Sequence, residues 1–160
     1  LLRSLPGDPS VSKTPILNLH PSYLPYNRGS HPNFWSFVNN TPKGVTIHEI
    51  DKRIDMGYLI YRKKIIFKKK LSLTFKNTHN FLISELEKIF IKNYNKIING
   101  TYNKKKIKSK GTLHKSSQLP KNLKSWNVKI SDYLKDYNKL FLNKGWLALV
   151  FFFILFPKIL

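Results

Sequence analysis

Three segments in the first half of the chain have the apolar pattern of β-strands. Residues 15–19 are mostly apolar and Pro21 follows them, whereas residues 44–50 alternate between apolar and polar positions. A short apolar run bounded by prolines is typical of a buried parallel strand, and alternation is typical of a strand with one buried face. Residues 58–67 are β-branched and aromatic but contain consecutive basic residues. We predict an edge strand there, because lysines protect sheet edges from further pairing.

Helical spacing appears in three other segments. Residues 31–40 place Phe34, Trp35 and Phe37 on one face, which favours a core helix over a base-stacking surface. Residues 71–99 have apolar side chains at steps of three and four, namely Phe81, Leu82, Leu86, Ile89, Phe90, Tyr94, Ile97 and Ile98. Residues 130–143 have a second amphipathic pattern. Together with the strands, these helices predict an α/β fold: a mostly parallel sheet flanked by helices, with a helical C-terminal part.

Composition divides the chain into three parts. Residues 1–100 hold the predicted strands and the longest helix, residues 101–144 form a basic loop with a helix, and residues 145–160 are a nearly apolar tail. A bilayer span needs about 20 apolar residues, so the tail is too short to cross by itself. A peripheral membrane contact, a core helix and an out-of-frame ending all fit its composition. We expect a helix that does not pack into the sheet core.

The net charge of +21 is extreme for 160 residues. Such a charge suits an anionic partner, whether nucleic acid, a nucleotide phosphate or a membrane surface. However, the lysines are spread along a chain rich in Asn and Ile, so a compositional bias explains the charge better than a dedicated RNA site. We therefore expect only non-specific nucleic-acid binding. The chain has no cysteine, which excludes disulfides and cysteine metal sites and fits a cytoplasmic location.

Candidate chemistry gathers at the ends of the first two predicted strands. Asn18 and His20 are two residues apart, so on an extended chain they point to the same side. An amide N–H can stabilise an oxyanion, and an imidazole can transfer protons near neutral pH. Asp55 follows the second strand and can orient that imidazole. No Ser or Cys nucleophile is needed if a substrate amine attacks. A turn with an ordinary hydrogen-bonded histidine also fits these three residues.

The sequence around these residues resembles that of a known family. The sequence NLHPS at 18–22, followed by LP at 24–25 and RG at 28–29, resembles a signature of the 10-formyltetrahydrofolate-dependent formyltransferases. GVTIH at 44–48 and IDMG at 54–57 resemble the second signature of that family. The resemblance covers about residues 15–100. It implies a Rossmann-like sheet and a catalytic set of Asn18, His20 and Asp55.

The same resemblance implies the substrates. The formyl donor is 10-formyltetrahydrofolate, the acceptor is a primary amine, and no metal is involved. Substrate or folate contacts are implied at seven further positions: Ser22, Arg28, Gly29, Glu49, Ile50, Asp51 and Gly57. Residues 26–29 and 42–51 look most like the amino-sugar members of the family, which implies a nucleotide-linked amino sugar. Methionyl-tRNA is the alternative acceptor.

Some features depart from the family pattern. Lys52 and Arg53 stand where an acidic residue and a glycine are usual, in the loop expected near the pterin. The family places a βαβ half before the first signature, where this sequence has only fifteen residues, so we expect the C-terminal portion of a catalytic domain with weak folate binding. A truncated, non-catalytic fragment and a basic RNA-associated or membrane-associated protein are the non-enzyme alternatives.

We expect structural rather than catalytic roles for two further histidines. His48 lies in the second predicted strand, where we expect it to pack at the strand end rather than to act as a ligand. GTLHK at 111–115 resembles a short motif of some amino-sugar members, but a loop histidine is the simpler interpretation of His114.

Overall fold

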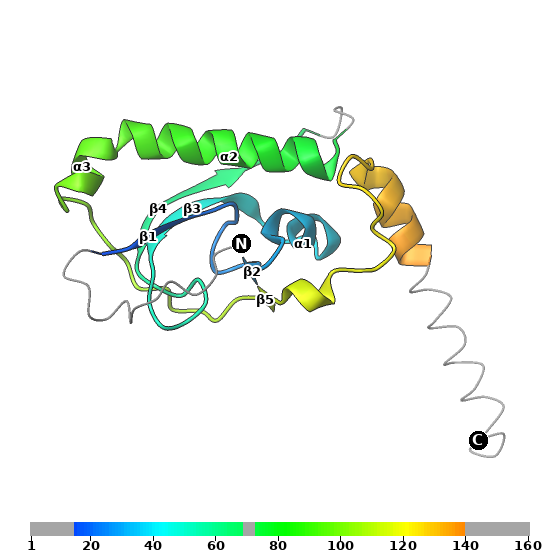
Figure 1. The fold of residues 1–160 in the computed structure, drawn as a ribbon, viewed down its shortest axis with the longest axis horizontal. Coiled ribbons are helices and arrows are strands. Elements are labelled where there is room, and N and C mark those ends of the chain that lie inside the picture. Colours follow the sequence, from blue (N-terminus) through cyan, green and yellow to red (C-terminus); the bar gives the residue numbers. More distant parts are fainter. Residues whose placement is uncertain (1–14, 69–72, 140–160) are drawn as a thin grey trace, which may run out of the picture.

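A computed structural model describes residues 15–68 and 73–139 of the chain. Its strands are β1 (Leu17–His20), β2 (Arg28–Gly29), β3 (Lys43–Glu49), β4 (Leu59–Ile65) and β5 (Leu113–His114). Its helices are α1 (Pro32–Val38), α2 (Phe75–Lys92) and α3 (Tyr94–Ile98), followed by a short 3-10 turn (Ser116–Gln118) and a helical segment at 130–139. In Figure 1, α2 lies along one face of the sheet and α1 lies beyond one end of β1.

The main sheet has the order β1-β3-β4, and both of its pairings are antiparallel. The α/β class with flanking helices is confirmed, and β4 lies at an edge as predicted. However, the interpretation of residues 15–19 as a parallel strand was wrong, since β1 runs antiparallel to β3. An apolar run reports burial but not the direction of the partner strand. Among the described strands, β2 and β5 form the parallel pair.

One hydrophobic core lies between the sheet and α2. Val45 and Ile47 on β3 meet Leu82 and Leu86 on α2, and all four side chains are almost completely buried. Thr74 caps the start of α2 by accepting a hydrogen bond from the backbone N–H of Asn77.

The single helix expected over residues 71–99 is two helices in the structure. Helix α2 ends at Lys92 and α3 starts at Tyr94, with Asn93 between them. The Asn93 side chain donates to the carbonyl of Ile89 at 2.8 Å. Asparagine competes in this way with the backbone hydrogen bonds of a helix, which is the physical reason for the break.

A second core is aromatic and joins the C-terminal helical segment to the rest of the fold. Phe34 lies 5.0 Å from Phe75 and 5.5 Å from Tyr133, measured between ring centroids. Trp35 and Ile130 complete the buried part of this cluster. The prediction that the aromatics of residues 31–40 belong to the core is therefore confirmed, as is helix in the described part of residues 130–143.

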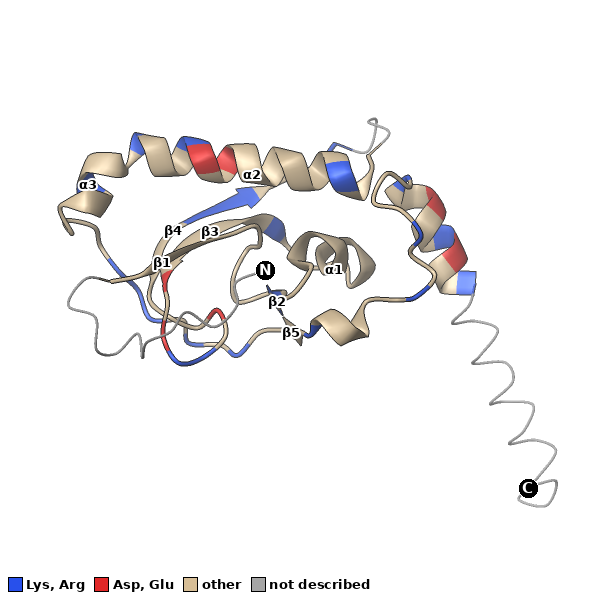
Figure 2. Ribbon diagram, in the orientation of Figure 1, with Lys and Arg blue, Asp and Glu red and all other residues tan. Residues whose placement is uncertain are grey.

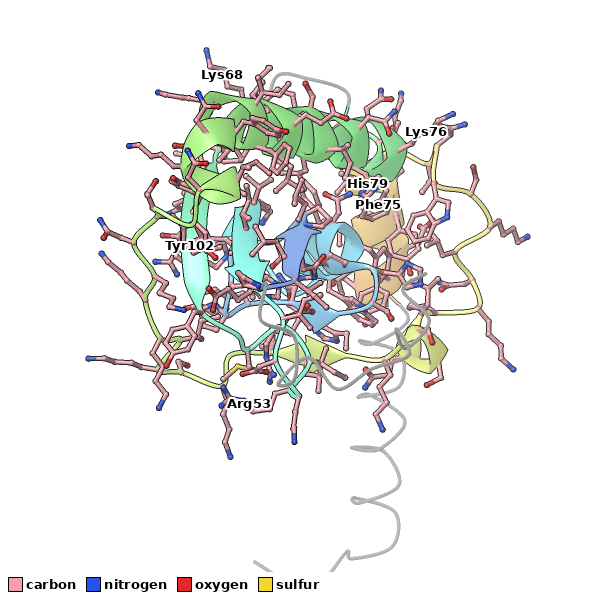
Figure 3. All side chains as sticks on the ribbon, turned by 60° about the vertical axis from the view of Figure 1, so that its left-hand side comes forward. Arg53, Lys68, Phe75, Lys76, His79 and Tyr102 are labelled. Carbon is pink, nitrogen blue, oxygen red and sulfur yellow. The ribbon has the colours of Figure 1, made fainter. Side chains whose placement is uncertain are left out.

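Basic residues are distributed over several elements. Figure 2 shows them on β4, at separate places along α2, and on the loops below the sheet. Arg53, Lys68 and Lys76 project from different sides of the molecule in Figure 3. The predictions for residues 1–14 and for the tail at 145–160 lie outside the described residues. Among the helices that the structure describes, none is long and apolar enough to cross a membrane.

Candidate active site

The pairing of β1 with β3 brings four polar side chains together. In this register Asn18 lies opposite His48 and His20 lies opposite Thr46. Because alternate residues of a strand share a face, these side chains lie on the side of the sheet opposite the Val45–Ile47 core. Asp55 comes from the loop after β3, where it adopts a left-handed backbone conformation with φ of 49°.

Asp55 is the centre of this cluster. Its Oδ1 accepts a hydrogen bond from Asn18 Nδ2 at 3.1 Å and lies 3.4 Å from His48 Nε2. Its Oδ2 accepts from the backbone N–H of Gly29 at 2.7 Å and lies 3.7 Å from His20 Nε2. The structure therefore brings together the three residues predicted to be catalytic, with Asn18 hydrogen-bonded to Asp55 and His20 at ion-pair distance from it.

The electrostatics of the cluster keep Asp55 ionised. Burial by itself would raise the pKa of Asp55, but the hydrogen bond with His48, the charge of His20 and the amide of Gly29 outweigh burial and lower the pKa to about 2. Burial lowers the pKa of His20 from its usual 6.5, and Asp55 only partly offsets this effect. At neutral pH the site thus holds a carboxylate beside a neutral imidazole.

Hydrogen-bond partners fix the protons of both histidines. His20 Nε2 lies 3.3 Å from the carbonyl oxygen of Asn27, and His48 Nδ1 lies 2.8 Å from the carbonyl oxygen of Glu49. A carbonyl oxygen only accepts, so each of these nitrogens carries a hydrogen. When the His48 ring is neutral, its lone pair is on Nε2 and accepts from the amide of Asn18 at 3.3 Å. When both ring nitrogens carry a hydrogen, Nε2 instead donates to Asp55 Oδ1. The two hydrogens of Asn18 Nδ2 are shared between Asp55 and His48.

His48 is the site residue that the sequence interpretation missed. We expected it to pack at a strand end, yet it is 1% exposed and contacts Asp55 and Asn18. The available signal was its spacing from Thr46, which puts both side chains on one face of β3. Using that signal requires the β1–β3 register, which the apolar pattern does not supply.

A late segment of the chain holds the loop between β1 and α1. Strand β5 pairs with β2, so the backbone N–H of Arg28 donates to Thr112 O at 2.8 Å and that of Ser30 donates to His114 O at 2.9 Å. The backbone N–H of Asn27 donates to Thr112 Oγ1 at 2.7 Å. These bonds orient the Gly29 amide, which donates to Asp55. We call residues 111–114 the strap.

The structure also changes the interpretation of His114. It lies in strand β5, so its assignment to a loop was wrong. Its ring stacks on Trp35 with 4.2 Å between centroids, and its Nε2 lies 3.2 Å from Asn39 Nδ2. The strap is therefore tied to α1 by a side-chain stack as well as to β2 by backbone hydrogen bonds.

Of the seven further predicted contact positions, two lie at the cluster. Gly29 donates to Asp55, and its φ of 81° with the carbonyl of His114 close by leaves no room for a side chain. Arg28 Nη1 donates to the carbonyl of Ile54 at 3.0 Å, next to Asp55. Arg28 therefore holds the loop that carries Asp55, and it does so through a backbone carbonyl rather than through a carboxylate.

The other predicted contact positions have structural partners. Ser22 is 2% exposed and its hydroxyl donates to the carbonyl of Tyr26. Glu49 accepts from Tyr102 and Lys104, and Asp51 pairs with Arg53 at 2.6 Å. The backbone N–H of Ile50 donates to Ile16, and Gly57 packs against the carbonyl of Glu49. These bonds anchor both ends of the loop at 50–58.

Comparison with known proteins identifies the family. A sequence model of the formyl transferase family matches residues 10–99, more than half of the chain. The chain belongs to the formyl transferase family. The region of the chain that matches includes Asn18, His20, His48 and Asp55, whereas the strap lies beyond it.

Two relatives with known names resemble the chain over part of their length. The dTDP-4-amino-4,6-dideoxyglucose formyltransferase of Mycobacterium bovis is 30% identical over 98 residues, which are 61% of this chain and 41% of that protein. The chain therefore spans about two fifths of the length of this relative. A methionyl-tRNA formyltransferase of Desulforamulus reducens is 40% identical over 50 residues, which are 31% of this chain and 16% of that protein.

A solved structure also resembles this protein over most of the chain. It is the formyltransferase PseJ from Anoxybacillus kamchatkensis, in complex with UDP-4,6-dideoxy-4-formamido-L-AltNAc and tetrahydrofolate. The sequence identity is 34% and the TM-score is 0.68, over 72% of this chain and 62% of PseJ. The likeness supports a Rossmann-like formyltransferase fold.

Proposed function

We propose that this chain carries the catalytic residues of an enzyme that transfers a formyl group from 10-formyltetrahydrofolate to the amine of a nucleotide-linked amino sugar. The observation that carries the proposal is the buried cluster in which Asp55 contacts Asn18, His20 and the amide of Gly29. An amide, an imidazole and a carboxylate in contact are suited to acyl transfer to an amine.

Each residue of the cluster has a role in this reaction. The amine lone pair attacks the formyl carbon, and the carbonyl oxygen becomes an oxyanion. The oxyanion takes over the Asn18 Nδ2 hydrogen that Asp55 accepts in the free site. Neutral His20, with Asp55 beside it, moves the proton from the attacking nitrogen to N10 of the folate. The bond between the formyl carbon and N10 then breaks, leaving a formamide and tetrahydrofolate. His48 accepts a hydrogen from Asn18 and so keeps the Asn18 amide oriented.

The donor fits beside the loop at 50–58. This loop presents Asp55 to the cluster and leaves Ile54 58% exposed next to it. An exposed apolar side chain adjacent to the catalytic carboxylate offers a surface for the pterin ring. Arg28 holds the Ile54 carbonyl and keeps this part of the loop in place.

The acceptor is assigned from the relatives. The Mycobacterium bovis relative is named for a dTDP-linked amino sugar, and PseJ was solved with a UDP-linked formamido sugar. Both matches cover more of this chain than the methionyl-tRNA formyltransferase match does. A nucleotide-linked amino sugar is therefore the acceptor that we propose.

A formyl-transfer assay tests the proposal. The protein is incubated with 10-formyltetrahydrofolate and, separately, a dTDP-linked 4-amino sugar, a UDP-linked 4-amino sugar and methionyl-tRNA, and formamide formation is measured by mass spectrometry. We expect transfer to an amino sugar, with kcat/KM reduced roughly 100-fold or more in each of Asn18→Ala, His20→Ala and Asp55→Ala. Asp136→Asn, an exposed carboxylate outside the site, is the matched control.

Two outcomes would contradict the proposal. Transfer to methionyl-tRNA but to neither sugar would refute the acceptor. Absence of transfer to every acceptor, by protein that shows a cooperative unfolding transition, would refute the activity itself.

A further inference from the structure

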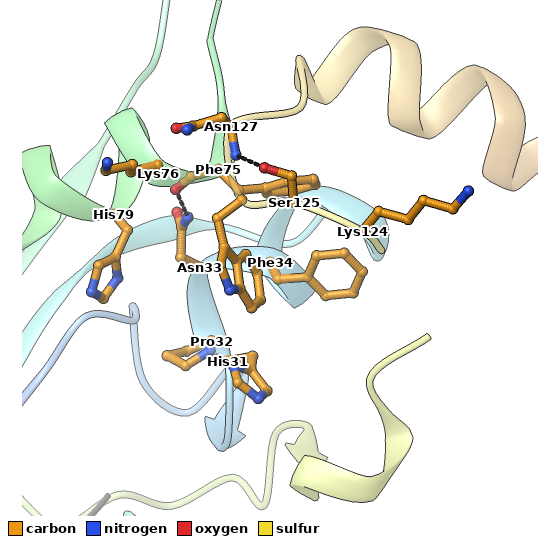
Figure 4. Close-up of a pocket in the computed structure, with 11 residues that line it drawn as sticks. His31, Pro32, Asn33, Phe34, Phe75, Lys76, His79, Lys124, Ser125 and Asn127 are labelled. Carbon is orange, nitrogen blue, oxygen red and sulfur yellow. Dashed lines mark hydrogen bonds between the residues drawn. The ribbon is translucent and has the colours of Figure 1, made fainter. Parts of the chain in front are cut away.

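A cavity of about 700 Å³ lies outside the catalytic cluster, and none of Asn18, His20 or Asp55 lines it. Its walls come from three segments that are far apart in the sequence: residues 31–34, 75–79 and 124–127. Its volume is in the range of pockets that hold small molecules. Figure 4 shows the lining residues around this space, from α1, the start of α2 and the loop before residues 130–139, with the amino groups of Lys76 and Lys124 directed outward. We call it the basic cavity.

Hydrogen bonds between its walls give the basic cavity a defined shape. Asn33 Nδ2 donates to Phe75 O at 2.9 Å and to Thr78 Oγ1 at 3.0 Å, which joins α1 to α2. The backbone N–H of Lys76 donates to Trp126 O at 2.8 Å, which joins α2 to the loop. The cavity is therefore present before any ligand binds, and little ordering is needed on binding.

The chemistry of the walls suits an anion that carries a flat ring. Trp126 is 40% exposed and stacks on His31 with 5.4 Å between ring centroids, so its indole presents an aromatic surface. Lys76 and Lys124 lie on the rim, on opposite sides in Figure 4. None of the eleven described residues that line the cavity is acidic. Aromatic side chains stack on bases, and lysines attract phosphate.

The anion attraction comes from these lysines rather than from the start of α2. The backbone N–H of Lys76 is already bonded to Trp126 O, and that of Asn77 is bonded to Thr74 Oγ1. Those donors at the start of the helix have partners within the protein.

One wall of the basic cavity lies close in sequence to the catalytic cluster. Gly29 donates to Asp55, and His31, two residues later, lines the cavity. Two residues span at most about 7 Å between Cα atoms. A ligand with its base in the cavity can therefore extend a sugar toward Asn18 and His20.

We infer that the basic cavity binds the nucleotide of the acceptor, with the base stacked on Trp126 and the diphosphate attracted by Lys76 and Lys124. The inference rests on the proposed function, in which the acceptor is a sugar linked to a nucleoside diphosphate. It assigns recognition of the nucleotide to residues that differ from those that transfer the formyl group.

Calorimetric binding of UDP and dTDP to the protein tests the inference. We expect both nucleotides to bind, and we expect Trp126→Ala and the double variant Lys76→Ala/Lys124→Ala each to weaken binding about tenfold. Two matched controls are available. Lys96→Ala/Lys135→Ala removes the same charge from exposed positions elsewhere, and Tyr94→Ala removes an aromatic side chain that is 50% exposed. Both controls should change the dissociation constant less than twofold.

Several results would overturn the inference. These are no binding of either nucleotide, equal losses in the two double-lysine variants, or an unchanged dissociation constant in Trp126→Ala. If Trp126→Ala does not fold, NMR of the unmodified protein replaces it. Addition of UDP should then shift the indole N–H signal of Trp126 and not that of buried Trp35, and an unmoved Trp126 signal would refute the inference.

The failure of this inference is distinguishable from failure of the proposed function. If formyl transfer occurs and Lys76→Ala/Lys124→Ala leaves the KM for the amino sugar unchanged, the cavity is not the nucleotide site. If UDP binding depends on the cavity residues but no acceptor is formylated, the cavity assignment holds and the proposed activity is refuted.

Discussion

Asp55 connects the residues that the candidate site brings together. It accepts hydrogen bonds from Asn18 and the Gly29 amide and lies beside His20 and His48. These partners come from separate positions on β1, β2 and β3, so a single carboxylate links the strands that form the site. The ionised form of Asp55 should therefore contribute to the stability of the fold as well as to the proposed reaction.

The stability of the protein should fall in acid because of Asp55. Its pKa in the folded state is about 2, below the usual 3.8, so its contribution is present above about pH 4 and is lost as the pH falls toward 2. A difference of this size corresponds to about 2 kcal/mol. We expect Asp55→Asn to lower the free energy of unfolding at pH 7 by about that amount and to weaken its dependence on pH below 4, as measured by urea denaturation.

Asp51→Asn is the control for this prediction. Asp51 is paired with Arg53 on the surface, so its substitution should lower the free energy of unfolding by less than about 1 kcal/mol. Equal stability of Asp55→Asn and the unmodified protein at pH 7 would contradict the role given to Asp55. His20 acts in the same direction, since burial lowers its pKa below 6.5 and acidification below that value also favours the unfolded chain.

His48 should hold the pKa of Asp55 low. His48→Phe keeps a ring of similar shape but removes the nitrogen that lies 3.4 Å from the carboxylate. We expect the pKa of Asp55 to rise from about 2 toward 3.8, measured by NMR of the Asp55 carboxyl carbon. His79→Phe, on α2, should leave it unchanged. An unchanged Asp55 pKa in His48→Phe would show that His48 only fills space.

At the scale of elements, the strap connects the candidate site to the second half of the chain. Thr112 receives a hydrogen bond from Asn27, and the two residues are separated by 85 positions. Strand β5 has only two residues and supplies backbone partners to the loop that positions Gly29. The strap lies outside the region that matches the family, so its role was not available from that match.

Two glycines provide a matched test of the strap. Gly111 and Gly100 both have a left-handed backbone, with φ of 55° and 64°. A Cβ on Gly111 would lie 1.9 Å from the carbonyl oxygen of Pro25, whereas nothing lies within 4 Å of one on Gly100. We expect Gly100→Ala to lower the free energy of unfolding by about 1 kcal/mol and Gly111→Ala to lower it by roughly 2 kcal/mol more. Thermal or urea unfolding measures both values. If both substitutions lowered the free energy of unfolding by a similar amount, the strap would be able to move away from Pro25 without destabilising the protein.

At the scale of the whole molecule, the positive charge of the described residues is spread over several elements. Among the residues that Figure 2 colours, lysines and arginines lie on β4, on α2 and on the loops. The net charge of +21 still creates a general attraction for polyanions. Such attraction is screened by salt because it acts between exposed charges.

We therefore expect non-specific binding to nucleic acid. Two short RNAs of unrelated sequence should bind with equal affinity, and both should lose affinity steeply as salt is raised from about 50 to 200 mM. Fluorescence anisotropy measures both quantities. Sequence-selective binding that persists at the higher salt would contradict this prediction and favour an RNA-binding function.

The sequence by itself determined the local features of this protein. The spacing of Asn18 and His20 on an extended segment placed both on one side, and the apolar spacing of residues 71–99 gave helical structure there. The aromatics of residues 31–40 were correctly placed in the core. Such predictions succeed because side-chain direction repeats with a period of two in strands and 3.6 in helices, which depends only on neighbouring residues.

Tertiary structure decided which distant segments meet. It made β1 antiparallel to β3, placed His48 beside Asp55, and brought Thr112 to Asn27. It also formed the basic cavity from three separate segments. Apolar spacing records whether a residue is buried but not what covers it, so strand direction, register and contacts across the chain depend on how the whole molecule packs.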